Sequence, residues 1–305
     1  MIADTGVRVQ GRAAAGATWH TRFMVTELDV SAPDGRILHA YDTGADAASG
    51  LTLVWHHGSP QTGAPLEPVL AATRERGIRL VSYGRPSYGG STPNPGRDVA
   101  SAAGDVAAVA DALGIDRFAV MGASGGGPHA LACAALLPER VRGVVTIAGI
   151  APFTERFDWF GGMVAPGGLR SALAGGRAGR AAYADTDEFD PEQFIPADFA
   201  ALDGAWSSLG EDVGRSAQWG DDGLIDDDVA FASPWGFDLE QVAAPVLLVQ
   251  GDLDRVVPRL HASWMLSRLP NAQLWARPED GHVSVLSVIP DALDRLVVLI
   301  GANEA

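Results

Sequence analysis

From residue 25 onward, short apolar runs typical of buried strands alternate with longer segments of small residues at helical spacing, such as 98–115. This alternation constrains the fold most, because strands separated by helices pair in parallel and need helices on both faces of the sheet. We therefore expect an α/β protein with a mostly parallel central sheet. The expected strands are residues 25–31, 37–43, 51–55, 78–83, 118–123, 144–150, 246–250 and 272–276, and the first two form an antiparallel hairpin around the turn sequence APDG.

The alternation is interrupted between residues 152 and 235. This segment holds 16 acidic and five basic residues and carries most of the chain's formal net charge of −16. Because its helical patches are inserted between two strands, we expect residues 152–235 to form a mainly helical cap on a core of residues 24–151 and 236–305. We interpret its acidic residues as a solvated face, and the alternative is an electrostatic filter for the substrate. Residues 1–23 show no periodicity and are expected to be a disordered extension.

The sequence VMGASGGGPHALA at residues 120–132 crowds four glycines around the hydroxyl of Ser124. GASGG fits the pattern G-x-S-x-G at a point where an expected strand ends and a helix begins. In that context the serine lies on a sharp turn, and the neighbouring glycines let the strand and the helix approach closely. The motif alone is equally compatible with a glycine-rich turn whose serine has no chemical role. The presence of the other groups that nucleophilic catalysis needs decides whether Ser124 is catalytic.

A serine hydroxyl needs a histidine as general base, and the histidine needs a carboxylate that orients it. Of the seven histidines, only His282 follows the last expected strand, in the loop PEDGHVSV. The carboxylate should also follow a strand, and VLLVQGDLDRVVP offers Asp252 and Asp254. We favour Asp254, because Asp252 comes directly after Gly251 and is expected to shape the turn. Ser124, Asp254 and His282 are therefore the predicted catalytic residues.

Acyl transfer also needs two donors for the oxyanion that forms. We expect the first from the backbone N–H of Gly125, directly after the nucleophile. We expect the second from the N–H of Ser59 in WHHGSPQTG, a loop that follows the third expected strand. The adjacent His56 and His57 of this loop point in different directions and have no third ligand nearby, so no metal site is expected.

Composition excludes several other classes of function. The negative net charge repels phosphate backbones and anionic membranes, so neither nucleic acid nor a membrane is expected as a partner. The chain has no lysine, which excludes Schiff-base chemistry and attachment of pyridoxal phosphate, and no cofactor is expected. The single cysteine, Cys133, rules out an intrachain disulfide. Because no segment has the pattern of a membrane span or a signal peptide, we expect a cytoplasmic protein.

In its motifs and in their order along the chain, the sequence of residues 24–301 resembles the α/β-hydrolase superfamily. HHGSP is similar to its oxyanion loop, GRPSYGGS to the loop after its fourth strand, GASGGG to its nucleophile elbow, GDLDRVVP to its acid loop and DGH to its histidine loop. The resemblance implies the α/β-hydrolase fold with a cap. It also implies a serine hydrolase, either an esterase or an enzyme similar to proline iminopeptidases.

This sequence departs from parts of that superfamily. It lacks the GGSWGS elbow of proline iminopeptidases, and Ser124 disfavours the aspartate nucleophile of haloalkane dehalogenases and epoxide hydrolases. Gly125 stands where a larger residue is common, which is expected to leave extra room beside the acyl group.

We expect this chain to transfer the acyl group of a small to medium carboxylic ester to water. Apolar residues near the start of the cap are expected to line the substrate pocket, although packing of the cap on the core explains them equally well. They are Phe153, Phe157, Trp159, Phe160 and Met163.

Two alternatives stay open. One is an aminopeptidase similar to proline iminopeptidases, in which carboxylates of the acidic cap hold the ammonium group of the substrate. The other is a ligand-binding protein of this fold without enzymatic activity. The sequence does not determine the oligomeric state.

Overall fold

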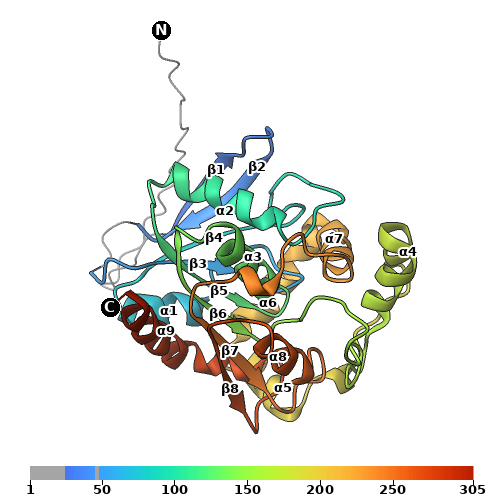
Figure 1. Cartoon of the computed structure of the whole chain (residues 1–305). Helices are drawn as coiled ribbons and strands as arrows, with labels where there is room; N and C mark the ends of the chain where they lie inside the picture. Colours follow the sequence, from blue (N-terminus) through green and yellow to red (C-terminus); the bar gives the residue numbers. More distant parts are fainter. Residues whose placement is uncertain (1–24, 45–47, 305) are drawn as a thin grey trace.

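The fold is built around an eight-stranded sheet with the strand order β1-β2-β4-β3-β5-β6-β7-β8 (Figure 1). The computed structural model describes residues 25–44 and 48–304. The predicted extension at residues 1–23 lies outside the described residues. The strands are β1 (Thr26–Ser31), β2 (Ile37–Asp42), β3 (Thr52–His56), β4 (Arg79–Tyr83), β5 (Phe118–Ala123), β6 (Val141–Ile147), β7 (Val246–Gly251) and β8 (Ala272–Arg277).

The strand pairing confirms the predicted sheet. β1 and β2 form the predicted antiparallel hairpin, and β2 pairs antiparallel with β4. The pairs from β4 to β8 are parallel. Every residue of β5 and β7 is buried, as expected for strands of a parallel sheet that is covered on both faces. The carboxyl ends of the parallel strands therefore lie at the same side of the sheet, where loops from distant parts of the sequence can meet.

Two layers of helices cover the sheet, and alternate residues of a strand face one layer or the other. In β3, Leu53 and Trp55 belong to one hydrophobic cluster and Val54 to the other. The two-residue period of a strand thus divides its apolar side chains between the two faces. The first cluster includes α1 (Glu67–Glu75) and α9 (Ile289–Glu304), and the second includes α2 (Ser101–Ala112), α3 (Gly126–Leu136) and α8 (Leu260–Leu266).

Between β6 and β7 the chain leaves the sheet and forms a helical segment. α4 consists of two helical halves, because Gly176 between them has a φ of 56°. In Figure 1, α4 is the helix farthest from the sheet, and it packs on α7. The helices of the segment are α4 (Gly167–Ala184), α5 (Pro196–Asp203), α6 (Ser207–Ser216) and α7 (Asp222–Phe231), and the short 3-10 turns of the fold are Pro191–Gln193, Ala217–Trp219, Leu239–Gln241 and Ser284–Val288.

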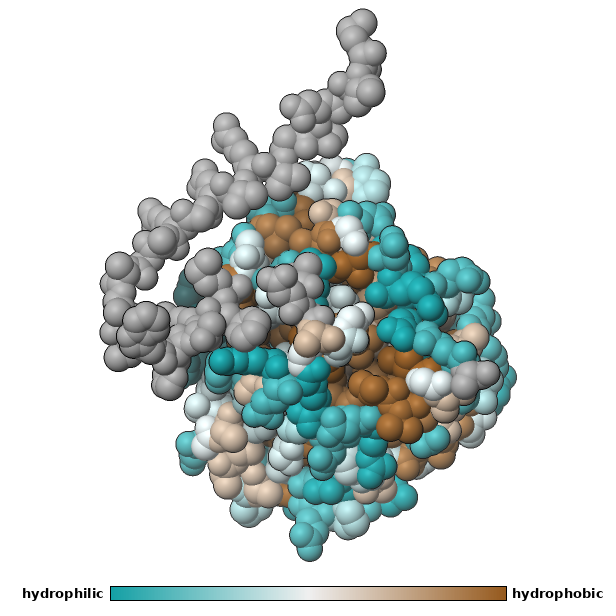
Figure 2. All heavy atoms as spheres, turned by 90° about the vertical axis from the view of Figure 1, so that its left-hand side faces the viewer, coloured by the Kyte–Doolittle hydropathy of each residue, from teal (hydrophilic) through white to brown (hydrophobic). Residues whose placement is uncertain are grey.

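The surface of the described residues is mixed in hydropathy. On the face at the left of Figure 1, apolar patches lie between hydrophilic ones (Figure 2). Val297 and Val298 of α9 are exposed apolar residues. Within residues 25–44 and 48–304, no helix combines the length and the apolar character needed to cross a bilayer.

Candidate active site

Ser124 lies at the turn between β5 and α3, where the motif predicts it. Its φ of 52° is in the left-handed region, which is unusual for a residue with a side chain and marks a strained turn. The flanking glycines permit close approach. A Cβ on Gly122 would lie 2.2 Å from the Gly126 oxygen, and one on Gly126 would lie 2.1 Å from the His56 oxygen. The glycines therefore allow β5, α3 and the loop after β3 to converge around the Ser124 hydroxyl.

The structure brings together the three side chains that were predicted to be catalytic. His282 Nε2 lies 3.0 Å from Ser124 Oγ, and His282 Nδ1 lies 2.9 Å from Asp254 Oδ2. The three residues follow β5, β7 and β8, so their contact depends on the parallel arrangement of these strands. Such a series can orient an imidazole and let it accept the proton of the hydroxyl.

Asp254 rather than Asp252 faces His282, as the sequence interpretation preferred. The buried Asp254 carboxylate accepts two hydrogen bonds at Oδ1 from backbone N–H groups of the following turn, each of 2.9 Å. Its Oδ2 accepts a further hydrogen bond from Gln250 Nε2 at 3.1 Å. These bonds fix the orientation of the carboxylate toward the imidazole. Asp252 instead pairs with Arg259 at 2.9 Å.

The charges around His282 favour its protonated form. Burial lowers the pKa of the imidazole. The Asp254 carboxylate raises this pKa through its charge and its hydrogen bond, and the charge of Asp198 raises it further. The net pKa of His282 therefore lies above its usual value of 6.5. A base in this position takes up a proton readily, and the carboxylate stabilises the imidazolium that results.

The two N–H groups predicted to hold the oxyanion lie in adjacent turns. Within the part of the chain that the structure describes, the backbone N–H groups of Ser59 and Gly125 donate no hydrogen bond. A Cβ on Gly125 would lie only 2.5 Å from Ser59 Oγ, so the two turns are in direct contact. Gln61 stabilises the turn that carries Ser59, because its Oε1 accepts a hydrogen bond from the Gly58 N–H at 2.6 Å. Both N–H groups are therefore free to donate to another acceptor, as the predicted role as oxyanion donors requires.

The two histidines of the same loop have structural partners. His57 Nδ1 donates a hydrogen bond to the Gly58 oxygen at 2.6 Å, and His57 Nε2 accepts one from the Arg85 N–H at 3.1 Å. Burial and the Arg85 guanidinium lower the pKa of His57 well below its usual value, which keeps the ring neutral. His56 Nε2 lies 3.6 Å from the buried sulfur of Cys133. The two rings thus point to different partners, as the sequence suggested.

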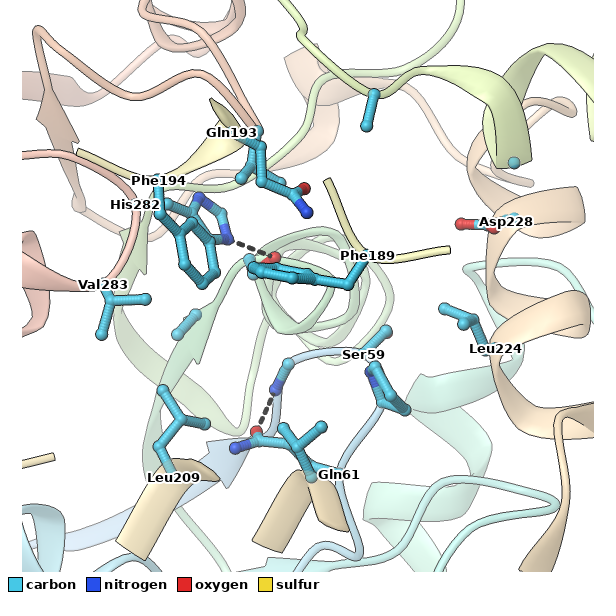
Figure 3. A pocket seen from close by; sticks show the side chains of 18 of the residues that line it. Ser59, Gln61, Phe189, Gln193, Phe194, Leu209, Leu224, Asp228, His282 and Val283 are labelled. Carbon is cyan, nitrogen blue, oxygen red and sulfur yellow. Dashed lines mark hydrogen bonds between the residues drawn. The ribbon is translucent and has the colours of Figure 1, made fainter. Parts of the chain in front are cut away.

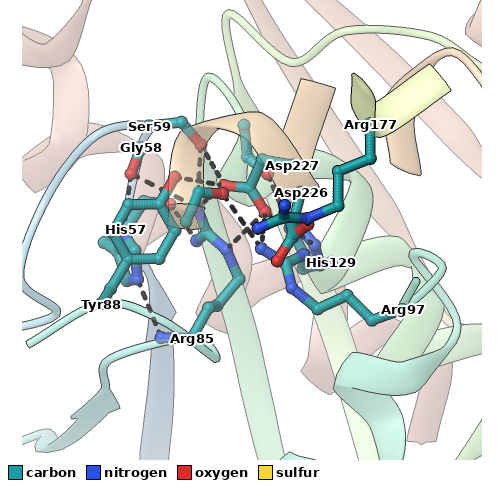
Figure 4. A network of polar contacts seen from close by, with 12 residues as sticks. His57, Gly58, Ser59, Arg85, Tyr88, Arg97, His129, Arg177, Asp226 and Asp227 are labelled. Atoms are coloured by element: carbon teal, nitrogen blue, oxygen red, sulfur yellow. Dashed lines mark hydrogen bonds and ion pairs between the residues drawn. The ribbon is translucent and has the colours of Figure 1, made fainter. Parts of the chain in front are cut away.

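A buried ionic network lies against Ser59, and sequence reasoning did not find it (Figure 4). Asp227 of α7 accepts hydrogen bonds at Oδ2 from Ser59 Oγ at 2.5 Å and from Arg85 Nη2 at 2.6 Å. Tyr88 Oη and Arg97 Nη2 reach the same carboxylate at 3.0 and 2.7 Å. Burial alone would raise the pKa of Asp227, but the two guanidinium groups hold it well below its usual range. The network therefore joins the expected oxyanion loop to α7 through buried charges.

The acidic segment is not simply a solvated face, which corrects the interpretation from sequence. Asp198, Asp212 and Asp227, on α5, α6 and α7, are fully buried and bind loops of the core. The Asp212 carboxylate, for example, accepts hydrogen bonds from the N–H and the hydroxyl of Thr62 at 3.0 and 2.6 Å. The core loops that these three carboxylates bind lie 85 to 168 residues away in the sequence, so local charge patterning could not reveal their burial.

Ser124 and His282 line a cavity of about 790 Å³ (Figure 3). In Figure 3, His282 lies on one side of the cavity and Asp228 on the opposite side. Asp228 pairs with the buried Arg180 at 2.6 Å, and burial, against the opposing effect of Arg180, raises the pKa of Asp228 to about 6. Much of the wall is apolar and comes from the segment between β6 and β7, including Leu169, Phe189, Phe194, Leu202, Leu209 and Leu224.

Two predictions about the pocket need correction. Of the five residues expected to line it, only Met163 is in the cavity wall. The other four pack with the core. Three of their rings contact one another, and Phe157 instead stacks on an aromatic ring of α8. The sequence shows that these residues are aromatic but not which way their rings point. The four residues that do not line the cavity are Phe153, Phe157, Trp159 and Phe160.

The second correction concerns the expected room beside Gly125. A Cβ at this position would lie 2.5 Å from Ser59 Oγ and 3.0 Å from Phe231 Cζ. The space that a larger residue would fill is therefore already occupied by the oxyanion loop and by α7.

Comparison with known proteins identifies the fold. A family model described as the alpha/beta hydrolase fold matches residues 52–176. The solved structure of bromoperoxidase from Bacillus anthracis has a TM-score of 0.69 at 21% sequence identity and covers 89% of this chain and 99% of that one. The chain has the α/β-hydrolase fold, and the matches support its membership of the α/β-hydrolase superfamily. The predicted fold and the predicted resemblance are thereby confirmed.

Two known proteins are similar to this chain over most of its length. Pimeloyl-(acyl-carrier protein) methyl ester esterase of Nitrosomonas europaea is 28% identical over 264 residues, which are 82% of this chain and 94% of the relative. Non-heme chloroperoxidase of Streptomyces lividans is 28% identical over 281 residues, which are 87% of this chain and 96% of the relative. Together the comparisons support hydrolase activity, and the names of the relatives differ in the reaction that they give.

Proposed function

We propose that this α/β-hydrolase cleaves carboxylic esters through an acyl-enzyme on Ser124. The observation that carries the proposal is the uninterrupted series of contacts from Ser124 Oγ through His282 to Asp254, at 3.0 and 2.9 Å. The unpaired N–H groups of Ser59 and Gly125 beside the hydroxyl support the same chemistry. Each group supplies one requirement of acyl transfer: a nucleophile, a base, an orienting carboxylate and donors for the oxyanion.

The first half of the reaction forms the acyl-enzyme. His282 Nε2 takes the proton of Ser124 as Oγ attacks the carbonyl carbon of the ester. The carbonyl oxygen becomes an oxyanion, which accepts hydrogen bonds from the N–H groups of Ser59 and Gly125. Asp254 stabilises the imidazolium of His282, which then gives its proton to the departing alcohol.

The second half of the reaction releases the acid. His282 now takes a proton from water, and the resulting hydroxide attacks the acyl carbon of the ester bond to Ser124. Collapse of the second oxyanion breaks the bond to Oγ, and the proton on His282 returns to Ser124.

The cavity supports an ester of small to medium size with an apolar acyl or alcohol part. We propose that residues 152–235 act as a cap, because this segment supplies much of the apolar wall that faces Ser124. A cavity of about 790 Å³ with a largely apolar wall favours a substrate whose apolar part can contact that wall.

One observation favours a second candidate, an aminopeptidase similar to proline iminopeptidases. Among the described residues that line the cavity, four are carboxylates and one is a guanidinium. An ammonium group on the substrate would be attracted by this excess of negative charge. The acidic residues are Asp187, Glu188, Asp221 and Asp228, and the basic residue is Arg180.

The proposal is tested with purified protein and three substrates: an aryl ester, a lactone and a prolyl arylamide. We expect turnover of the aryl ester, and we expect Ser124→Ala to lower kcat by about 10⁶-fold, because the nucleophile and the base act as one unit. Preferred turnover of the prolyl arylamide would favour the aminopeptidase. Absence of turnover together with no reaction of Ser124 with a fluorophosphonate would favour a non-enzymatic ligand-binding protein.

A further inference from the structure

Asp198 of α5 is a fully buried carboxylate that binds the loop carrying His282. Its Oδ1 accepts hydrogen bonds from the backbone N–H groups of Val283 and Ser284, each at 2.8 Å. The Ser284 hydroxyl donates a third hydrogen bond to the same oxygen at 2.9 Å. Its Oδ2 accepts one from the Ile195 N–H at 3.0 Å, at the start of its own helix. Four neutral donors thus satisfy one buried negative charge.

These bonds hold the histidine loop on both sides of His282. The Gly281 N–H donates a hydrogen bond to Ser284 Oγ at 2.8 Å, and Ser284 Oγ in turn donates to Asp198. The residue before His282 and the two after it are therefore all connected to one carboxylate. The approach is so close that a Cβ on Gly281 would lie 2.1 Å from Asp198 Oδ2. The glycine of the DGH sequence is thus needed for contact with α5.

The charge of Asp198 also acts on the imidazole. Two carboxylates raise the pKa of His282 against the effect of burial: Asp254 after β7, with the larger effect, and Asp198 on α5. Asp280, two residues before His282 in the sequence, is paired with Arg277 at 2.7 Å. Asp198 does not line the cavity, so it has no route to contact a substrate.

We infer that Asp198 is a positioning residue for His282, which fixes the histidine loop and adds its negative charge to that of Asp254. This inference rests on the proposed role of His282 as a general base. It means that the base is correctly placed only while α5, which belongs to the segment between β6 and β7, is packed on the core. The segment would then have two roles, because it both walls the cavity and sets the geometry of the base.

The main test compares Asp198→Asn with Asp203→Asn. Asp203 is the last residue of the same helix and is exposed, so it is a matched control for the same chemical change. We expect Asp198→Asn to lower kcat by up to about 10²-fold, the loss that follows a misplaced catalytic group, with little change in KM. We also expect the acid limb of the kcat/KM profile to move to lower pH, because a negative charge that favours the imidazolium has been removed.

A second variant separates position from charge. Ser284→Ala removes the hydroxyl that links Gly281 to Asp198 but leaves the carboxylate in place. For Ser284→Ala we expect a lower kcat, whereas the acid limb of its pH profile of kcat/KM should stay at the wild-type pH. If Asp198→Asn fails to fold, this variant carries the test. Wild-type kcat in Ser284→Ala, or in folded Asp198→Asn, would overturn the inference.

A readout without substrate distinguishes failure of this inference from failure of the proposed function. In protein labelled with ¹³C at histidine Cε1, the His282 signal is assigned by its loss in His282→Asn and titrated by NMR. We expect its pKa to fall in Asp198→Asn and to stay unchanged in Asp203→Asn. An unchanged pKa in folded Asp198→Asn would overturn the inference, whereas absent esterase activity with a shifted pKa would count against the proposed function alone.

Discussion

Gly125→Ala is a direct test of how the expected oxyanion site is packed. The backbone of Gly125 has φ −55° and ψ −16°, which alanine adopts without strain, so the substitution acts only through its added methyl group. That carbon would lie 2.5 Å from Ser59 Oγ. The Ser59 hydroxyl cannot move away easily, because it is bound to Asp227 at 2.5 Å and to Arg85 at 2.9 Å. The clash must therefore be relieved by shifting one of the two turns that carry the N–H donors.

The expected loss is that of one misplaced oxyanion donor, about 10²–10³-fold in kcat or about 3–4 kcal/mol. KM should change little, because these N–H groups bind the oxyanion of the transition state more strongly than the ground-state carbonyl. The assay is steady-state hydrolysis of an aryl ester by wild-type protein, Gly125→Ala, Ser59→Ala and the double variant. Ser59→Ala removes the oxygen that the new methyl group meets but keeps the backbone N–H of residue 59.

The double variant decides whether the steric argument holds. We expect it to be more active than Gly125→Ala, because the clash with Ser59 Oγ is gone, so the two substitutions should be strongly non-additive. Wild-type kcat in Gly125→Ala would refute the reasoning. So would a double variant in which the two losses simply add.

Two further predictions concern stability. Asp227→Asn leaves the buried guanidinium groups of Arg85 and Arg97 without their shared carboxylate, so urea denaturation should show a free energy of unfolding lower by about 3–5 kcal/mol. A decrease below about 1 kcal/mol would contradict a stabilising role of this network. Burial lowers the pKa of His56 to about 3 and that of His261 to about 4, from 6.5, so the unfolded state binds more protons below about pH 6.5. Stability should therefore fall as the pH is lowered from about 6.5 toward 4, because the shifts of these two rings together exceed the opposing shift of Asp228, whose pKa is raised to about 6. A urea midpoint that stays constant over this range would count against neutral buried rings.

The sequence predicted those parts of the molecule that are encoded by local patterns. The alternation of strands and helices follows from hydrophobic periodicity, and the resulting parallel sheet places loops after β5, β7 and β8 at one side. Ser124, Asp254 and His282 each lie in the loop or turn that follows a parallel strand, so their proximity followed from the topology. The glycines around Ser124 indicated close approach of backbones, which the structure shows at Gly122 and Gly126.

The directions of side chains and the partners of buried charges could not be predicted in the same way. Phe157 and Met163 are both apolar and only six residues apart, yet only Met163 faces the cavity, because the packing of α8 decides where the ring of Phe157 lies. Asp198 and Asp227 looked like members of a solvated acidic run. Their burial depends on the His282 loop and on Arg85, which are distant in the sequence and meet them only in the folded protein.

The central claim is that His282, held by Asp254, activates the hydroxyl of Ser124. The most direct measurement is the rate and site of labelling by a fluorophosphonate, followed by intact mass and peptide mapping, in the wild-type protein and in His282→Ala. We expect one phosphonyl group on Ser124 in the wild-type protein and labelling at least about 10³-fold slower without the base. Labelling at another residue, or equal rates in the two proteins, would contradict the account.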